Sequence, residues 1–346
     1  MIKINRKFGI EIEFYGISTH KVRKAMRKIN VPMTAGRTRR KDHWTLVYDM
    51  SVQNEGHEIV SPILKGKKGL REACKVAKAL REAGAKVDAT CGLHVHVDAS
   101  DLSGAQMKNI LLRYAKYENE IEEFFPVSRK ESEYSRSVTR YIDDQSFLWK
   151  TEPRQIAVWC DHYDCLSLES YINHGTIEFR HHSGTLSAEK IEAWVLFIQN
   201  FVQVSKDLNM IEENPFAKKL KKFDIGQATE EKLRFVAELF LNAPRRLMKV
   251  SRSSLMKKLK MTEEELRDFM KLFEKAFEVE VMIENRSYRV LPFDHAECRL
   301  YQQSQSPAFS TNLENENDTG LWMNFPASLC SFYQERAMEM DHCYRS

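Results

Sequence analysis

Several features are missing from this sequence, and each absence excludes a class of protein. No apolar run approaches the roughly 18 residues that a membrane-spanning helix needs. The first residues, MIKINRKFGIEIEF, contain no apolar stretch long enough for a secretory signal. The seven cysteines are scattered and form no C-x-x-C pair, which favours a reducing compartment. We therefore expect a soluble, cytoplasmic protein with no membrane partner.

The chain also lacks a large excess of either charge. Its 53 lysines and arginines face 49 aspartates and glutamates, a net charge of +4, which argues against a chain that binds nucleic acid along its whole length. A further absence concerns nucleotides, because the sequence contains neither a G-x-x-x-x-G-K-[ST] loop nor a kinase-like glycine-rich loop. Those two designs of nucleotide site are therefore excluded. With 346 residues, the chain can form one large domain or two or three smaller ones.

The stretch GLHVHVD, residues 92–98, is the first that indicates a functional site. Successive side chains of a β-strand point to opposite faces, so His94, His96 and Asp98 share one face while the leucine and the valines share the other. Two imidazoles and a carboxylate at this spacing can reach a bound cation or an anionic phosphate. The alternative is a polar outer face on a half-buried strand, and other strands must decide between the two interpretations.

More strands with charged side chains are predicted in the first 185 residues. The stretches FGIEIEF, at 8–14, and GTIEFRHHSGT, at 175–185, alternate apolar with charged residues in the period-two pattern of half-buried strands. Residues 43–49 and 56–62 are predicted as two further strands joined by a polar turn. The charged residues on these strands are Glu11, Glu13, Asp49, Glu58, Glu178 and Arg180.

If these strands belong to one sheet, five carboxylates and two imidazoles converge on one side of it. Carboxylates gathered in this way repel one another and protonate unless cations neutralise them, so metal ions are implied. A set of ligands rich in oxygen and without thiolates favours Mg²⁺ or Mn²⁺ over Zn²⁺. Hard metals held by carboxylates beside an arginine suit phosphoryl transfer from ATP.

Helices and one irregular segment are predicted between and after these strands. Apolar residues at helical spacing predict helices at about 19–30, 69–83, 103–125 and 189–208. Residues 127–158 show little periodicity and many cations, which predicts either a functional lid or a partly disordered segment. Arg136 and Arg140 are candidates there for gripping a carboxylate or phosphate. The stretch CDHYDC, at 160–165, has an irregular spacing that favours buried thiols over a soft-metal site.

The character of the sequence changes after residue 212. We predict a first domain at 1–212, a helical module at 213–296, and a tail at 297–346 made of a polar linker and a helical segment. Three helices followed by a β-ribbon around Asn285 give the module the element order of a winged-helix domain. Its third helix, TEEELRDFMKLFEKAF, is acidic and would repel phosphates, which argues against nucleic acid as a ligand. Contact with a protein partner is the expectation for this module.

Four stretches in order, FGIEIEF, GHEIVSP, CGLHVHVD and TIEFRHHSGT, resemble the motifs of the amidoligase family, within the superfamily of glutamine synthetase and glutamate–cysteine ligase. The resemblance covers about residues 1–210. It implies an α+β fold in which an antiparallel sheet forms a funnel, covered by helices, that binds ATP and two or more Mg²⁺. It also implies formation of an amide bond in two steps: ATP phosphorylates a carboxylate, often glutamate-like, and an amine then displaces phosphate from the acyl phosphate. The substrates would be a carboxylate and an amine, either small molecules or peptides.

The resemblance also implies roles for the charged residues. The residues expected to hold the metal on the ATP phosphates are Glu11, His94 and Glu178. Those expected on the metal nearer the substrate are Glu13, Glu58 and Asp49. Catalytic roles fall to Arg180, Glu58 and Glu178, and nucleotide contacts to Arg180, His96 and His181. Asp98 stands where relatives have a small polar residue, and an asparagine that often precedes the E-x-R strand by about ten residues is replaced here by DCLSLES.

Two other functions remain open at this point. Zinc-dependent amidohydrolases also carry an H-x-H at a strand end, but they place it near the start of a chain of repeated βα units. Here two acidic strands come first, and the pattern turns helical after residue 211. A non-catalytic binding module on the same fold is the other alternative. Loss of a metal-ligating glutamate or of the arginine would indicate it, and all of them are present.

Overall fold

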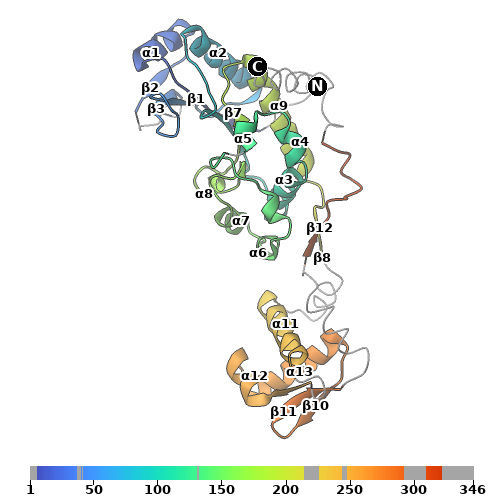
Figure 1. The fold of residues 1–346 in the computed structure, drawn as a ribbon. Helices are drawn as coiled ribbons and strands as arrows, with labels where there is room; N and C mark the ends of the chain where they lie inside the picture. Colours follow the sequence, from blue (N-terminus) through green and yellow to red (C-terminus); the bar gives the residue numbers. More distant parts are fainter. Residues whose placement is uncertain are drawn as a thin grey trace. The chain divides into compact units, whose positions relative to one another are not determined.

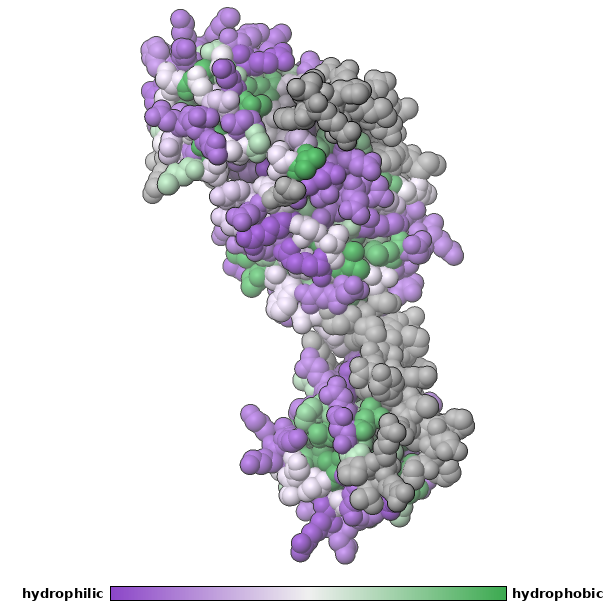
Figure 2. Space-filling view, viewed as in Figure 1, coloured by the Kyte–Doolittle hydropathy of each residue, from purple (hydrophilic) through white to green (hydrophobic). Residues whose placement is uncertain are grey.

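The computed structural model describes residues 6–36, 40, 42–130, 132–213, 226–243, 248–291 and 309–321. The chain divides into two compact units, unit 1 at Met1–Met210 with Thr311–Ser346 and unit 2 at Ile211–Ser310. In Figure 2 the visible face of the described residues is mostly hydrophilic, with scattered hydrophobic patches. Within this part of the chain, no helix has the length and apolar character needed to cross a membrane.

Unit 1 is built on a seven-stranded sheet with the order β2-β3-β4-β1-β5-β7-β6. Figure 1 labels β1, β2, β3 and β7 of this sheet. Its strands are β1 (Phe8–Phe14), β2 (Met33–Ala35), β3 (Trp44–Tyr48), β4 (His57–Val60), β5 (Gly92–Asp98), β6 (Leu166–Ser167) and β7 (Thr176–Ser183). All neighbours are antiparallel except β2 and β3, which are parallel. The mixture of helices and strands agrees with an α+β protein. The prediction of an antiparallel sheet is wrong at β2, which follows the helix α1 (Thr19–Lys28) and pairs with β3 in parallel.

The sheet follows from the alternation of side chains seen in the sequence. In β1, the apolar residues Phe8, Ile10, Ile12 and Phe14 are buried. The helices α2 (Gly66–Glu82) and α3 (Gly104–Lys116) both pack on α9 (Ala188–Ser205). The three helices bury most of their apolar residues. One face of the central strands thus joins the core, which leaves the other face for polar side chains.

Some helices differ from their prediction. The single helix predicted at 103–125 breaks at Tyr117 into α3 and α4 (Glu118–Glu122). Residues 127–158 are less irregular than predicted, because they contain four short helices: α5 (Val127–Lys130), η1 (Thr139–Tyr141), α6 (Gln145–Leu148) and α7 (Pro153–Trp159). A further short helix, α8 (Ser170–His174), precedes β7. Of these helices, α5 and α8 contact β7.

Unit 2 has its own core and its own sheet. Its elements are α11 (Gln227–Leu241), β9 (Lys249–Ser251), α12 (Arg252–Leu259), α13 (Glu263–Phe277), β10 (Val281–Glu284) and β11 (Ser287–Val290). The strands pair in the order β10-β11-β9, and the helices bury a cluster that includes Phe240, Phe273 and Phe277. The hairpin predicted around Asn285 is confirmed, while β9 was not predicted.

The chain returns to unit 1 after unit 2. Strands β8 (Ile211–Glu213) and β12 (Phe309–Thr311) form a two-stranded sheet. Further on, the carboxylate of Asp318 accepts hydrogen bonds from Arg113 Nε at 3.0 Å, Lys116 Nζ at 3.1 Å and the Tyr117 hydroxyl at 3.1 Å. We call this cluster the Asp318 anchor. The prediction of a polar linker at the start of the tail (297–346) did not foresee it, and the helical segment predicted beyond it lies outside the described residues.

Candidate active site

The register of the central strands brings the charged residues of the sequence motifs together. Strand β1 lies between β4 and β5, with Glu13 opposite Glu58 and Glu11 opposite His94. Strand β5 pairs on its other side with β7, where His96 lies opposite Glu178. Four neighbouring strands therefore place their carboxylates and imidazoles on one face of the sheet, as the alternation predicted.

Side-chain distances show how tightly this cluster is packed. The ring nitrogens of His94 lie 3.6 Å from a carboxylate oxygen of Glu11, 3.5 Å from one of Glu13 and 3.8 Å from one of Glu178. The Nε2 atom of His96 lies 3.6 Å from Glu11 and 3.8 Å from Glu178. These separations exceed those of direct hydrogen bonds. The two imidazoles thus stand at ion-pair distance from three carboxylates.

Three overlapping groups in this cluster have the geometry of metal ligands. Within each group, one ligand atom from every residue lies within 4.8 Å of the others. The groups are Glu11, Glu58 and His94; Glu11, His96 and Glu178; and Glu13, Asp49 and Glu58. The structure therefore brings together all six residues predicted as metal ligands, and it adds His96 to them.

The pKa directions follow from crowding and burial. Burial raises the pKa of Glu58 well above its usual value, and the negative charges of Glu11, Glu13 and Asp49 raise it further. Burial alone would also raise the pKa of Glu11, but the neighbouring His94 and His96 outweigh it and lower that pKa well below its usual value. A bound cation would offset the repulsion among these carboxylates.

Arg180 lies at a β-bulge in β7. Leu93 pairs with His182 and Val95 with Phe179, so β7 has two residues where β5 has one. A bulge of this kind bends the strand and redirects its side chains. The two bulged residues are Arg180 and His181.

The guanidinium of Arg180 is directed to the site by three neighbours. It donates a hydrogen bond to Glu178, its Nε donates to the Tyr134 carbonyl at 3.2 Å, and its Cζ lies 5.8 Å from the centre of the Tyr163 ring. Its side chain is only 8% exposed, so little water competes for it. The arrangement places a fixed positive charge next to one of the candidate ligand groups, where it could stabilise negative charge on a bound group.

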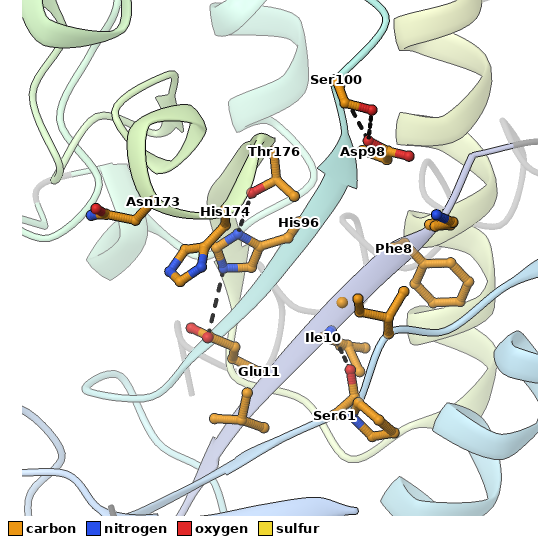
Figure 3. Close-up of a pocket in the computed structure, with 15 residues that line it drawn as sticks. Phe8, Ile10, Glu11, Ser61, His96, Asp98, Ser100, Asn173, His174 and Thr176 are labelled. Atoms are coloured by element: carbon orange, nitrogen blue, oxygen red, sulfur yellow. Dashed lines mark hydrogen bonds and ion pairs between the residues drawn. The ribbon is translucent and has the colours of Figure 1, made fainter. Parts of the chain in front are cut away.

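Two cavities meet at this cluster. One, of about 380 Å³, is lined by the candidate metal ligands together with Arg180, Tyr134 and Tyr163. The other, of about 520 Å³, lies over Phe8, Ile10 and the segment 60–63. Figure 3 shows this second cavity, with His96 between Thr176 and Glu11. The first cavity is lined mainly by charged and polar residues, whereas the second is partly apolar.

Asn173 and His174 line both cavities, and sequence reasoning missed them. They end the short helix α8, whose C-terminal Gly175 takes the left-handed conformation, with φ 65°, that turns the chain into β7. The sequence signal was present, since Asn173 precedes Glu178 by five residues. The family resemblance predicted an asparagine about ten residues before that strand, and no asparagine stands at that position. Asn173 lies closer to the strand and was therefore not predicted.

Several predicted residues lie elsewhere. His181 is buried against Tyr114 and Phe125 on the core side of the sheet, and burial lowers its pKa to about 3. The nucleotide contact predicted for His181 does not fit this position. Asp98 lines the 520 Å³ cavity but accepts hydrogen bonds from the backbone and hydroxyl of Ser100. An alternating pattern assigns a residue to a face without showing what covers that face.

Two cations and two thiols singled out in the loops also lie outside the candidate ligand groups. Arg136 donates to Asp161 at 3.0 Å, and Arg140 forms an ion pair with Asp164, so both grip carboxylates of the protein itself. Cys160 and Cys165 are buried, and no cysteine belongs to the metal-ligating groups found among the described residues. The preference for buried thiols over a soft-metal site agrees with these positions.

Comparison with known families decides the relationship. The sequence model of a family described as "putative amidoligase enzyme" matches residues 4–202, more than half of the chain. The chain belongs to the amidoligase family. The match includes all four sequence motifs and both cavities, and it ends before unit 2 begins. A search of curated proteins gave no match. The family indicates an enzyme of the ligase type.

Proposed function

We propose that this amidoligase joins a carboxylate and an amine in a reaction that depends on ATP and on Mg²⁺ or Mn²⁺, by way of an acyl phosphate. The observation that carries the proposal is the set of three overlapping ligand groups, in which five carboxylates meet two imidazoles and one guanidinium within the matched region. Membership of the glutamine synthetase superfamily, with its funnel-shaped sheet, is part of the same proposal.

The donor set fits the proposed metals. Carboxylate oxygens dominate, imidazole nitrogens are few and thiolates are absent from the three groups, which is the preference of Mg²⁺ or Mn²⁺. Glu11, His96 and Glu178, with His94 beside them, would hold the ion that meets the ATP phosphates. Glu13, Asp49 and Glu58 would hold the ion nearer the carboxylate substrate. When bound, such ions would neutralise negative charge on the phosphates.

The two cavities suggest how the substrates divide. The 520 Å³ cavity has an apolar floor suited to a base and ribose, and it borders the group of Glu11 and His96. The 380 Å³ cavity contains the group of Glu13, Asp49 and Glu58. We therefore assign the nucleotide to the larger cavity. The smaller cavity would take the carboxylate and the amine. These substrates would be small molecules or peptides, and the carboxylate would include a glutamate-like acid. Arg180 would then face the transferred phosphoryl group.

One assay tests the proposal. The full chain is incubated with ATP, Mg²⁺ and pools of amino acids, peptides and amines, and ADP and phosphate are measured. We expect at least one pair of pools to raise ADP formation, and the Glu178→Gln variant to remain at background. If no pool exceeds that variant, a non-catalytic binding role replaces the ligase. Turnover that needs Zn²⁺ but no ATP would instead indicate a hydrolase.

For unit 2 we propose a winged-helix-like module that binds a protein partner. Its order of elements, α11-β9-α12-α13 followed by the β10-β11 hairpin, supports the fold. The first turn of α13 carries Glu263, Glu264 and Glu265, a charge that disfavours contact with phosphates. A titration with fluorescent duplex DNA at physiological salt tests this point. We expect no binding in the micromolar range, and tighter binding would reject the assignment.

A further inference from the structure

Arg129 is a buried cation beside the candidate active site. It lies in α5, it is only 3% exposed, and it lines neither cavity. A buried guanidinium has five N–H donors that need acceptors. The structure supplies the backbone carbonyls of Arg180 and His181, the latter 3.4 Å from Nε of Arg129. Arg129 thus reaches the strand that carries two of the proposed catalytic residues.

The acceptors of Arg129 are the two residues of the β7 bulge. A bulge disrupts the regular ladder of backbone hydrogen bonds at that point, and a buried carbonyl without a donor costs free energy. The planar fork of one guanidinium satisfies both carbonyls at once. Arg129 therefore stabilises the irregular shape of β7 on which the direction of Arg180 depends.

The same guanidinium also lies close to the candidate metal ligands, next to Gly92. A Cβ atom added at Gly92 would lie 3.0 Å from a terminal nitrogen of Arg129, 3.3 Å from an Oε2 of Glu13 and 2.7 Å from Nε2 of His94. These three side chains therefore converge on the bare backbone of Gly92, whose N–H also donates to Glu13. The glycine of the GLHVHVD motif is required here by close approach.

We propose that Arg129 is a positioning residue of this active site. Its fork holds the β7 bulge in the shape that turns Glu178 and Arg180 toward the cavity, and it supports Glu13 above Gly92. The inference rests on the proposed function, because it assigns Arg129 to the support of the proposed metal groups. It touches neither substrate nor metal, and it acts through the residues that do.

An electrostatic role and a positioning role of Arg129 predict opposite changes in metal affinity when this residue is replaced. Removing a positive charge near Glu13 would strengthen the binding of a cation. Releasing the bulge would weaken it, because Glu178 loses its fixed orientation. Replacing residues that orient metal ligands commonly lowers metal affinity by about 10- to 100-fold. The sign of the change therefore separates a positioning role from a purely electrostatic one.

The chain offers a matched control in Arg113. This arginine is also buried, at 1% exposure, and it donates to Asp318, Ser205 and the Gly320 carbonyl. It lines neither cavity. Its replacement removes a buried guanidinium from unit 1 without touching β7. Replacement of either arginine is therefore expected to lower stability, but only replacement of Arg129 is expected to lower metal affinity.

The experiment measures binding of Mn²⁺ alone to the full chain, by the electron paramagnetic resonance signal of the free ion. The variants are Arg129→Lys, Arg129→Met, Arg113→Lys and Arg113→Met, and circular dichroism checks that each is folded. Lysine keeps the positive charge but lacks the planar guanidinium. If Arg129→Met does not fold, the Mn²⁺ affinity of Arg129→Lys still tests the role of the guanidinium. We expect Mn²⁺ affinity to fall about 10- to 100-fold in Arg129→Lys and to stay within about twofold of the wild type in Arg113→Lys.

The outcomes separate this inference from the function on which it rests. Wild-type affinity in Arg129→Lys, or tighter binding in Arg129→Met, would overturn the positioning role while the metal site stands. An equal loss in the Arg113 variants would overturn it as well, because the effect would then be one of general destabilisation. Absence of Mn²⁺ binding by the wild type would reject the proposed metal site, and the role of Arg129 with it.

Discussion

Two buried clusters of charge in unit 1 have opposite balances. In the Asp318 anchor, one carboxylate meets two cations, Arg113 and Lys116, at 2.9–3.1 Å. In the candidate active site, the carboxylates of the three ligand groups outnumber the guanidinium of Arg180. The anchor is complete within the protein itself. The active site has an excess of negative charge that an external cation can neutralise.

The contrast shows that buried charge can serve stability at one place and ligand binding at another. Burial alone would raise the pKa of Asp318, but hydrogen bonds and charges from Arg113 and Lys116 outweigh it and hold that pKa below its usual value. In the active site, the pKa of Glu58 moves the other way. Satisfied charges stabilise the native state, and crowded like charges stabilise a bound metal instead.

The largest expected effect is on the anchor. Replacing Asp318 by alanine leaves two cations without their partner, one of them fully buried, and loss of one partner of a buried ion pair costs about 3–5 kcal/mol. We expect that loss in the free energy of unfolding, measured by urea denaturation. Asp101→Ala, which breaks an exposed ion pair with Arg6, serves as the control and should cost below about 1 kcal/mol. Equal costs would erase the distinction between the clusters.

The converse change is Glu178→Gln in the active site. Glutamine keeps an acceptor for Arg180 and removes one of the repelling charges, so we expect unfolding free energy within about 1 kcal/mol of the wild type. ADP formation should fall by about 10²- to 10³-fold, the usual cost of removing one electrostatic contact to the transition state. Urea denaturation and the ADP assay measure the two quantities. A strongly destabilised variant would mean that this carboxylate is structural, like Asp318.

Metal ions should act on one cluster alone. At 100 times its dissociation constant, an ion that binds only the native state adds about 2.7 kcal/mol of stability. We expect Mg²⁺ to raise the melting temperature of the wild type and of Asp318→Ala by a similar amount, and that of Glu178→Gln by less. Differential scanning calorimetry with and without EDTA measures this. The comparison fails if all three proteins respond equally.

A smaller effect concerns pH and the anchor. Since the pKa of Asp318 is lowered in the native state, its stabilising contribution is present above the unfolded value of about 3.9 and is lost as the pH falls through the native value. The difference in unfolding free energy between the wild type and Asp318→Asn should therefore be constant near neutral pH and shrink below about pH 4. A difference that persists at the lowest pH would show that the charge of Asp318 contributes little.

Period-two alternation in short segments was enough to predict the central strands and their charged faces. Glu11, Glu13, His94 and Glu178 met because residues two apart share a face and because these strands became neighbours. The family resemblance supplied the assumption of one sheet. Strand order and register themselves depend on contacts far apart in the sequence, which local patterns do not encode.

The features that were missed all depend on such distant contacts. The β-bulge at Arg180 leaves no mark in the alternation of residues 176–183, and Asn173 belongs to a five-residue helix too short for a periodic signal. Asp318 binds Arg113 across 205 positions of sequence. Its segment is polar and rich in asparagine, a composition that is also typical of linkers. Composition alone therefore did not distinguish a linker from a segment with a buried contact.

The return of the chain at the Asp318 anchor changes how unit 2 should be regarded. The backbone N–H of Asn312 donates to the Met210 carbonyl at 2.9 Å, and the side chain of Asn315 donates to the Asn209 carbonyl at 2.8 Å. The points where the chain leaves and rejoins unit 1 are therefore adjacent. Unit 2 is therefore an insertion in the chain of unit 1 and not a C-terminal extension. A variant without unit 2 needs a short turn that connects the two ends of unit 1 at these points. A stop codon at the same place would also delete the aspartate that holds α3.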